Sequence, residues 1–147
     1  MEWVLRSSSL EMTEDMLGHG RHGNVYRGYY DQEEVAIKKV SRVDMALDEE
    51  TSLRLAREIE ALTTLEHPNI VSILGYVNTE DAMLIVFELI AGGDLKKWLS
   101  EPKLEMNWKQ RVLILIQIAR AIQYLHSNCK YFLIFVKIIA IFKYKYN

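Results

Sequence analysis

Three closely spaced glycines and a lysine are the residues of this sequence whose types and spacing best suit phosphate chemistry. Gly18, Gly20 and Gly23 form a G-x-G-x-x-G pattern, and Lys38 follows after two short apolar runs. A glycine turn can lay backbone N–H groups against phosphate oxygens because no Cβ atom stands in the way. The ammonium group adds a positive charge, so the stretch is typical of a phosphate-binding turn.

The residues around the glycines predict that this turn belongs to a β-hairpin. A lone G-x-G-x-x-G pattern also occurs in dinucleotide-binding proteins, where the glycines open a helix whose N-terminus meets a pyrophosphate. Here the residues after Gly23 alternate instead, with Val25, Arg27 and Tyr29 on one face, which is strand periodicity. For the glycines alone, an ordinary hairpin without a ligand remains the alternative.

A further strand is predicted from Val35 to Val40, after a polar turn at Asp31 to Glu34. Ala36 and Lys38 are two residues apart and therefore share one face of this strand. A small side chain and an ammonium group then lie side by side beneath the glycine turn. This arrangement suits an adenine ring above Ala36 and phosphates beyond it.

With these residues the sequence resembles the protein kinase family, whose signatures begin with G-x-G-x-x-G-x-V and V-A-I-K. The departure is His22, where the family usually carries an aromatic residue. The resemblance implies an α+β fold, with a five-stranded antiparallel sheet and helix C, followed by the first helices of an incomplete helical C-lobe. It also implies ATP as the cofactor, with binding residues Leu17, Gly18, Gly20, Gly23, Val25, Ala36, Lys38, Phe87, Glu88, Ile90 and Asp94.

One carboxylate is predicted to lie at the apolar face of a helix later in the chain. Leu55, Ile59 and Leu62 recur at helical spacing, and Glu58 lies between them on or beside the same face. Breaking a buried ion pair by removing one partner can cost about 3 to 5 kcal/mol, so such a carboxylate needs a partner. Lys38 is the natural partner, and the resemblance implies the same ion pair. The alternative for Glu58 is a solvated helix face.

Two strands and a long helix are predicted in the second half of the chain. Apolar runs at Ile70 to Val77 and Met83 to Leu89 complete the five-stranded antiparallel sheet. Asn107 and Gln110 form a capping-box pattern that opens a helix. Because this helix is apolar on nearly all sides between Val112 and Leu125, the pattern is typical of a helix buried on most sides. Without the larger lobe that covers such a helix in the kinase family, we expect it to expose an apolar patch here.

The segment after the last predicted strand is similar to the hinge of the kinase family. On that pattern Phe87 lies at the back of the adenine pocket, the backbones of Glu88 and Ile90 bind the adenine edge, and Asp94 reaches the ribose. These roles are implied by the resemblance. A strand that ends in a Gly-Gly turn is the alternative.

The later motifs of the family do not occur in the sequence. H-R-D-x-x-x-x-N, D-F-G and A-P-E are all missing, and with them the proton-accepting base and the magnesium ligands. We expect a longer parent to transfer the ATP γ-phosphate, with Mg²⁺, to Ser, Thr or Tyr of a protein substrate, and these residues alone to be inactive. The alternative is a non-catalytic module that binds nucleotide or competes for a partner. The run from Trp108 to Arg111 is similar to tyrosine-kinase-like and receptor-like Ser/Thr kinases.

The resemblance covers residues 10–129, with an N-lobe and hinge at 10–90 and the start of a C-lobe at 91–129. Residues 1–9 are expected to be a lead-in without a function of its own. In the last 18 residues, 130–147, 15 are Phe, Ile, Lys, Tyr or Asn, which are spelled mostly by A and T codons. We interpret this tail as translated intron, and an amphipathic membrane-surface tail is the alternative.

Composition narrows the classes of partner. The net charge is -2 and the basic residues do not gather until the far C-terminus, so nucleic acid is not an expected partner. Cys129 is the single cysteine and shows no metal-ligand spacing with the histidines, so neither a disulfide nor a metal site is expected. No secretory signal is visible, which fits a cytoplasmic location or the cytoplasmic side of a receptor parent. Membrane attachment of a parent stays open.

Overall fold

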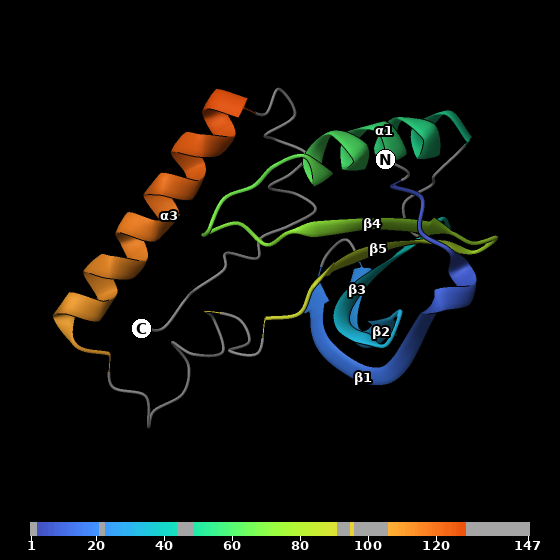
Figure 1. Cartoon of the computed structure of the whole chain (residues 1–147), viewed down its shortest axis with the longest axis horizontal. Coiled ribbons are helices and arrows are strands. Elements are labelled where there is room, and N and C mark those ends of the chain that lie inside the picture. Colours follow the sequence, from blue (N-terminus) through green and yellow to red (C-terminus); the bar gives the residue numbers. More distant parts are fainter. Residues whose placement is uncertain (1–2, 21–22, 44–48, 91–94, 96–105, 129–147) are drawn as a thin grey trace. The chain divides into compact units, whose positions relative to one another are not determined.

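The computed structural model describes residues 3–20, 23–43, 49–90, 95 and 106–128 (Figure 1). The chain forms two compact units. The first consists of Met1–Leu65 and Ser72–Leu89, and the second of Glu66–Val71 and Ile90–Asn147.

The first unit is built on one antiparallel sheet of five strands. In the order in which they lie side by side, the strands are β1 (Leu10–Gly20), β2 (Gly23–Tyr30), β3 (Glu33–Ser41), β5 (Ala82–Glu88) and β4 (Ile73–Asn78). The predicted five-stranded antiparallel sheet is therefore confirmed. Strands β3 and β5 are rich in β-branched residues, and runs of successive buried residues in both show that both faces are covered there.

The α-helix described in this unit, α1 (Glu49–Thr63), packs against the sheet and lies above β4 and β5 in Figure 1. Its apolar residues Leu55, Ile59 and Leu62 are buried, as their spacing predicted. Glu60 accepts a hydrogen bond of 3.3 Å from the hydroxyl of Tyr76 on β4. The helix is therefore attached to the sheet by a polar contact as well as by its apolar stripe.

Strand β4 begins three residues later than the apolar run predicted. The chain makes a turn after His67, in which the N–H of Ile70 donates to the carbonyl oxygen of His67 at 3.1 Å. Ile70 and Val71 are buried, yet they lie outside the strand. Burial rather than strand pairing accounts for their apolar character.

The residues before β1 take part in the packing of the first unit. Leu5 and Leu10 pack against a buried cluster of Val35, Ile37 and Val86. The backbone of Trp3 to Leu5 also bonds to β4, because the N–H of Leu5 donates to Tyr76 O at 2.8 Å and the Tyr76 N–H donates to Trp3 O at 3.0 Å. The lead-in therefore stabilises this unit.

The described helix of the second unit is α3 (Trp108–Asn128), and it begins as the sequence predicted. The N–H of Gln110 donates to Asn107 Oδ1 at 3.0 Å, and the N–H of Asn107 donates to Gln110 Oε1 at 2.9 Å. These two reciprocal bonds are a capping box, in which two backbone donors without helical partners are satisfied together.

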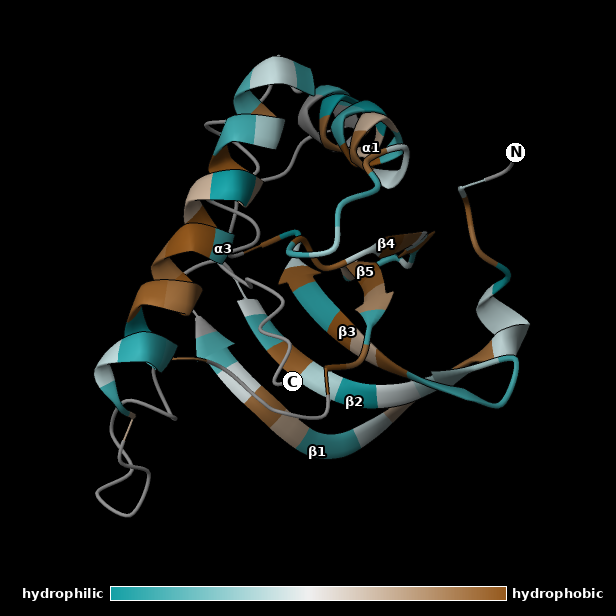
Figure 2. Ribbon diagram, turned by 60° about the vertical axis from the view of Figure 1, so that its left-hand side comes forward, coloured by the Kyte–Doolittle hydropathy of each residue, from teal (hydrophilic) through white to brown (hydrophobic). Residues whose placement is uncertain are grey.

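Among the described residues, helix α3 is buried along one stripe and exposes apolar side chains outside it, as expected for a helix that lacks the cover of a larger lobe. Ile114, Ala121 and Leu125 are buried along one stripe, whereas Leu113 and Leu115 are 55% and 63% exposed. Figure 2 shows the apolar band in the N-terminal half of this helix. An apolar pattern reports what a helix is able to bury, and covering all of its sides requires neighbours on every side.

Gly75 of β4 gives a test of the contact with the lead-in. Its φ is +150°, and a Cβ atom there would lie 2.4 Å from Trp3 O and 2.8 Å from Leu5 Cγ. We expect Gly75→Ala to lower the free energy of unfolding by about 1 to 3 kcal/mol, since strain and overlap act together. Urea unfolding measures this change.

Gly18→Ala is the matched control, because a Cβ atom at Gly18 has no neighbour within 4 Å. Equal losses of stability in the two variants would contradict the role given to the lead-in contact.

Candidate functional site

The glycine turn joins β1 to β2, as the hairpin prediction required. Gly18 lies opposite Val25 and Gly20 lies opposite Gly23 in the register of the two strands. Just before the turn, His19 Nδ1 lies 2.6 Å from Asn24 Oδ1. This side-chain hydrogen bond connects the two arms of the hairpin.

Gly23 is required by the backbone itself. Its φ is +122°, and a Cβ atom at this position would lie 2.2 Å from the carbonyl oxygen of Lys39 on β3. Gly18 has no such constraint, because a Cβ atom added there would have nothing within 4 Å. The third glycine of the pattern is therefore explained by folding, and the first is not.

The strand register brings the residues predicted for the adenine and phosphates onto one face of the sheet. Val25 lies opposite Lys38 in the β2–β3 pair. Ala36 lies opposite Phe87 in the β3–β5 pair. Because directly opposed residues and residues two apart share a face, all four side chains stand on the same side of the sheet. Leu17, three residues before the end of β1, is 36% exposed.

Lys38 and Glu58 are the two buried charged side chains among the described residues, with exposures of 8% and 6%. Burial lowers the pKa of the Lys38 ammonium below its ordinary value, because desolvation disfavours the charged form. The two groups belong to the same unit, on β3 and α1. Their direct pairing as an ion pair stays a prediction.

The predicted hinge begins at the end of β5. Phe87 is fully buried. Glu88 forms two hydrogen bonds with Ser72. The Glu88 N–H donates to Ser72 O at 3.1 Å, and the Glu88 carboxylate accepts the Ser72 N–H at 2.8 Å. Ile90 is half-buried, and Asp94 lies outside the described residues.

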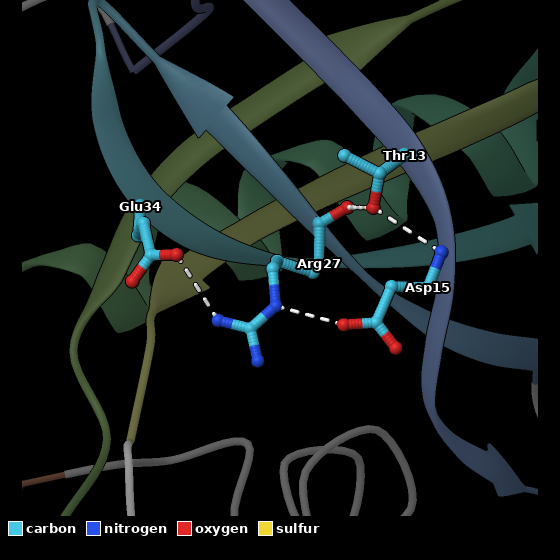
Figure 3. Close-up of polar contacts among 4 residues, drawn as sticks. All are labelled: Thr13, Asp15, Arg27 and Glu34. Atoms are coloured by element: carbon cyan, nitrogen blue, oxygen red, sulfur yellow. Dashed lines mark hydrogen bonds and ion pairs between the residues drawn. The ribbon is translucent and has the colours of Figure 1, made fainter.

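Arg27 forms a polar cluster on this face that sequence reasoning did not find. Its Nε donates to Asp15 Oδ2 at 2.8 Å, and its Nη1 donates to Glu34 Oε1 at 3.1 Å (Figure 3). The alternation of β2 placed Arg27 on the same face as Val25. Asp15 was not predictable as a partner, because β1 is irregular where Asp15 lies.

Within the described ranges, no group of three or more His, Cys, Asp or Glu side chains is placed to hold a metal ion. The sequence also lacks the motifs that carry magnesium ligands in the kinase family, so the residues present do not fit a catalytic Mg²⁺ site. Of the helices described, none combines the length and apolarity needed to cross a membrane.

Comparison with known proteins gives concordant matches. The family model of protein tyrosine and serine/threonine kinases matches residues 11–131. LysM domain receptor-like kinase 3 of Arabidopsis thaliana is 30% identical over 131 residues, which are 86% of this chain and 19% of that protein. RasGEF domain-containing serine/threonine-protein kinase X of Dictyostelium discoideum is 35% identical over 126 residues, 86% of this chain and 13% of that protein.

Among solved structures, the chain is similar to a crystal structure of Rad53 1-466 in complex with AMP-PNP. The TM-score is 0.69 at 26% sequence identity, and the match covers 81% of this chain and 30% of that one. This chain spans 7% of the length of one curated relative and 19% of another. Because the family model extends from β1 through α3, over the sheet that carries the buried lysine, the chain belongs to the protein tyrosine and serine/threonine kinase family.

Proposed function

We propose that the first unit is the ATP-binding part of a protein kinase domain. The observation that carries this proposal is the position of Lys38, a buried ammonium group on the sheet face shared by Val25 and Ala36. Its strand, β3, lies beside β2, which leaves the glycine turn. A buried ammonium group on this face is placed to bind an anionic ligand in addition to its contacts within the protein. The similarity to a Rad53 complex with AMP-PNP supports a nucleotide as that anion.

The adenine would lie between Val25 and Ala36, with Leu17 over it and Phe87 at its back. Ala36 leaves room for a flat ring because its side chain is a single methyl group. Since the Glu88 N–H is already donated to Ser72 O, adenine recognition at Glu88 would fall to its carbonyl oxygen. The remaining contacts implied by the family are those of Ile90 with the adenine edge and of Asp94 with the ribose.

The phosphates would lie between the glycine turn and Lys38. Gly18 has steric room that folding does not explain, which suits the close approach of its backbone to a phosphate. Lys38 would bind the phosphates nearest the sugar, and Glu58 would orient it from α1 as an ion-pair partner. Both side chains belong to the first unit and both are buried.

Phosphoryl transfer is proposed for a longer parent and not for these residues alone. The proton-accepting base and magnesium ligands are missing from the sequence. Loss of a general base by itself removes a factor of about 10² to 10⁴ in rate. Relatives described as serine/threonine-protein kinases support Ser and Thr as acceptors. The same missing motifs favour, as a second candidate, a non-catalytic module that binds nucleotide or competes for a partner of an intact kinase.

ATP affinity tests the proposed binding site. We expect Lys38→Met to weaken ATP binding about tenfold or more, because a charged hydrogen bond to phosphate is lost. In a double-mutant cycle with Glu58→Gln, the two effects should differ from additivity by about 0.5 kcal/mol or more. Isothermal titration of the full chain with ATP measures both quantities.

Lys39→Met is the matched control, because Lys39 is the exposed neighbour of Lys38 on the opposite face of β3. Its ATP affinity should equal that of the wild type. A wild-type chain that binds no ATP, or equal losses in the two lysine variants, would overturn the proposed site.

The pH dependence of stability tests the state of Lys38 in the chain without added ATP. Because burial lowers its folded-state pKa below 10.5, the unfolded chain binds this proton more tightly than the folded chain. Stability should therefore rise with pH above the folded-state pKa and level off above 10.5. We expect the stability of the wild type relative to Lys38→Met to increase between about pH 7 and about pH 10 in urea unfolding.

Lys39→Met again provides the comparison, because Lys39 is exposed on the opposite face of β3 and its removal changes no buried charge. A difference for Lys38→Met that stays constant over this range contradicts the role assigned to desolvation.

A phosphate-transfer assay tests the assignment of catalysis to a longer parent. With Mg-ATP and a generic protein substrate, we expect no turnover by the 147-residue chain, since the sequence lacks the base and the metal ligands. Turnover that disappears in Lys38→Met would show that these residues are catalytic on their own.

A further inference from the structure

Strand β1 is interrupted just before the glycine turn. Met12 pairs with Gly28 and the next pair is Met16 with Tyr26, so three residues of β1 stand opposite Arg27 alone. Extra residues of this kind bend a strand and interrupt its backbone hydrogen bonds with the neighbouring strand. The backbone of β1 is therefore not fixed there by regular pairing with β2.

A second irregularity follows at once. Between the pair formed by Met16 and the pair formed by Gly18, Leu17 has no partner on β2. The segment that leads into the glycine turn thus has two register shifts within a few residues. Other contacts must determine where the turn begins relative to β2 and β3.

Side chains supply those contacts at the first irregularity, as Figure 3 shows. The Thr13 hydroxyl donates to the backbone carbonyl oxygen of Arg27 at 2.8 Å and accepts the Asp15 N–H at 3.2 Å. The Arg27 guanidinium then donates to Asp15 on β1 and to Glu34 on β3. One arginine side chain consequently connects three neighbouring strands.

The cluster lies on the face of the sheet that carries the proposed nucleotide site. Arg27 stands opposite Ala36, and Val25 stands opposite Lys38 in the same strand pair. Asp15 is two residues before Leu17, the residue proposed to cover the adenine. A shift of β1 at Asp15 would therefore be transmitted within one or two residues to Leu17 and Gly18.

An arginine suits this position for a geometric reason. Its planar guanidinium presents several N–H donors in a fixed arrangement, so one side chain is able to bind two carboxylates from opposite sides. The hydrogen bond to Asp15 raises the pKa of Arg27, in keeping with a favourable contact between the two charges. Exposed ion pairs add little to overall stability, so the cluster has its main effect on local geometry.

We propose that Arg27, held between Asp15 and Glu34 and joined to Thr13, is a positioning residue that sets the start of the glycine turn over β3 and so strengthens nucleotide binding. The inference rests on the proposed ATP site, to which it adds residues outside the kinase signature motifs. Arg27 acts through the placement of Leu17 and Gly18 rather than by touching the phosphates.

Arg27→Met tests the proposal in the full chain, with ATP as the probe. Arg6→Met is the matched control, since Arg6 forms an exposed ion pair with Asp31 at 3.8 Å and neither residue is part of the proposed site. We expect Arg27→Met to weaken ATP binding about fivefold, as for the loss of an ion pair with good geometry, and Arg6→Met to leave it unchanged. Asp15→Asn and Glu34→Gln should each show part of the effect.

Amide hydrogen exchange provides a readout that does not depend on nucleotide. In Arg27→Met, exchange should be faster in residues 16–20 and unchanged in β4 and β5. Faster exchange throughout the sheet would indicate a general loss of stability and would overturn the positioning role. Arg27→Lys should restore only part of the ATP affinity, because a single ammonium group lacks the two-sided geometry.

The two proposals fail in different ways. If the wild type binds no ATP, the proposed function is wrong, and the exchange comparison still decides whether Arg27 positions the turn. If the wild type binds ATP and Arg27→Met binds it equally well, the ATP site stands and the role of Arg27 in binding is overturned. Unchanged exchange in residues 16–20 overturns it as well.

Discussion

The burial of the Lys38 ammonium group is the constraint on which the first unit depends. A charge removed from water costs several kcal/mol unless other charges or hydrogen bonds offset that cost. The sheet nevertheless holds Lys38 in the middle of β3, with strands on both sides and a buried carboxylate, Glu58, on the helix of the same unit. A core built only for stability would carry an apolar side chain at this position. A lysine at this position therefore fits the nucleotide site proposed for this unit.

Much of the fold was predictable because its signals are local. The alternation after Gly23 predicted a hairpin, and the spacing of Asn107 and Gln110 predicted the capping box that opens α3. The start of β4 was not predictable in the same way, because Ile70 and Val71 are buried outside the ladder. Apolar character reports burial, and pairing must be inferred separately. The exposure of α3 is likewise not given by its residue types, because an apolar side chain is buried only where another element packs on it.

The same distinction between local signals and non-local contacts applies to the candidate site. Periodicity was sufficient to place Ala36 and Lys38 on one face, since both lie on the same strand. The alignment of Val25 with Lys38 follows from the register of β2 and β3, which the sequence does not give. The Arg27 cluster required knowledge of an irregular strand, and no spacing rule relates Asp15 to Arg27 across two extra residues. The roles of Ile90 and Asp94 rest on family membership, because backbone recognition of a ligand leaves no mark in the residue types.

The contact between the lead-in and β4 also bears on where the folded unit starts. The family model begins at residue 11, whereas the backbone of Trp3 to Leu5 is bonded to Tyr76 and Leu5 packs in the buried cluster. The first residue of the unit is therefore different when it is taken from sequence similarity than when it is taken from the contacts in the structure. Cutting the chain at the boundary of similarity would leave the backbone groups of Tyr76 on an open sheet edge, a surface that invites pairing with other chains. The short stretch before the recognisable domain thus protects the sheet from such association.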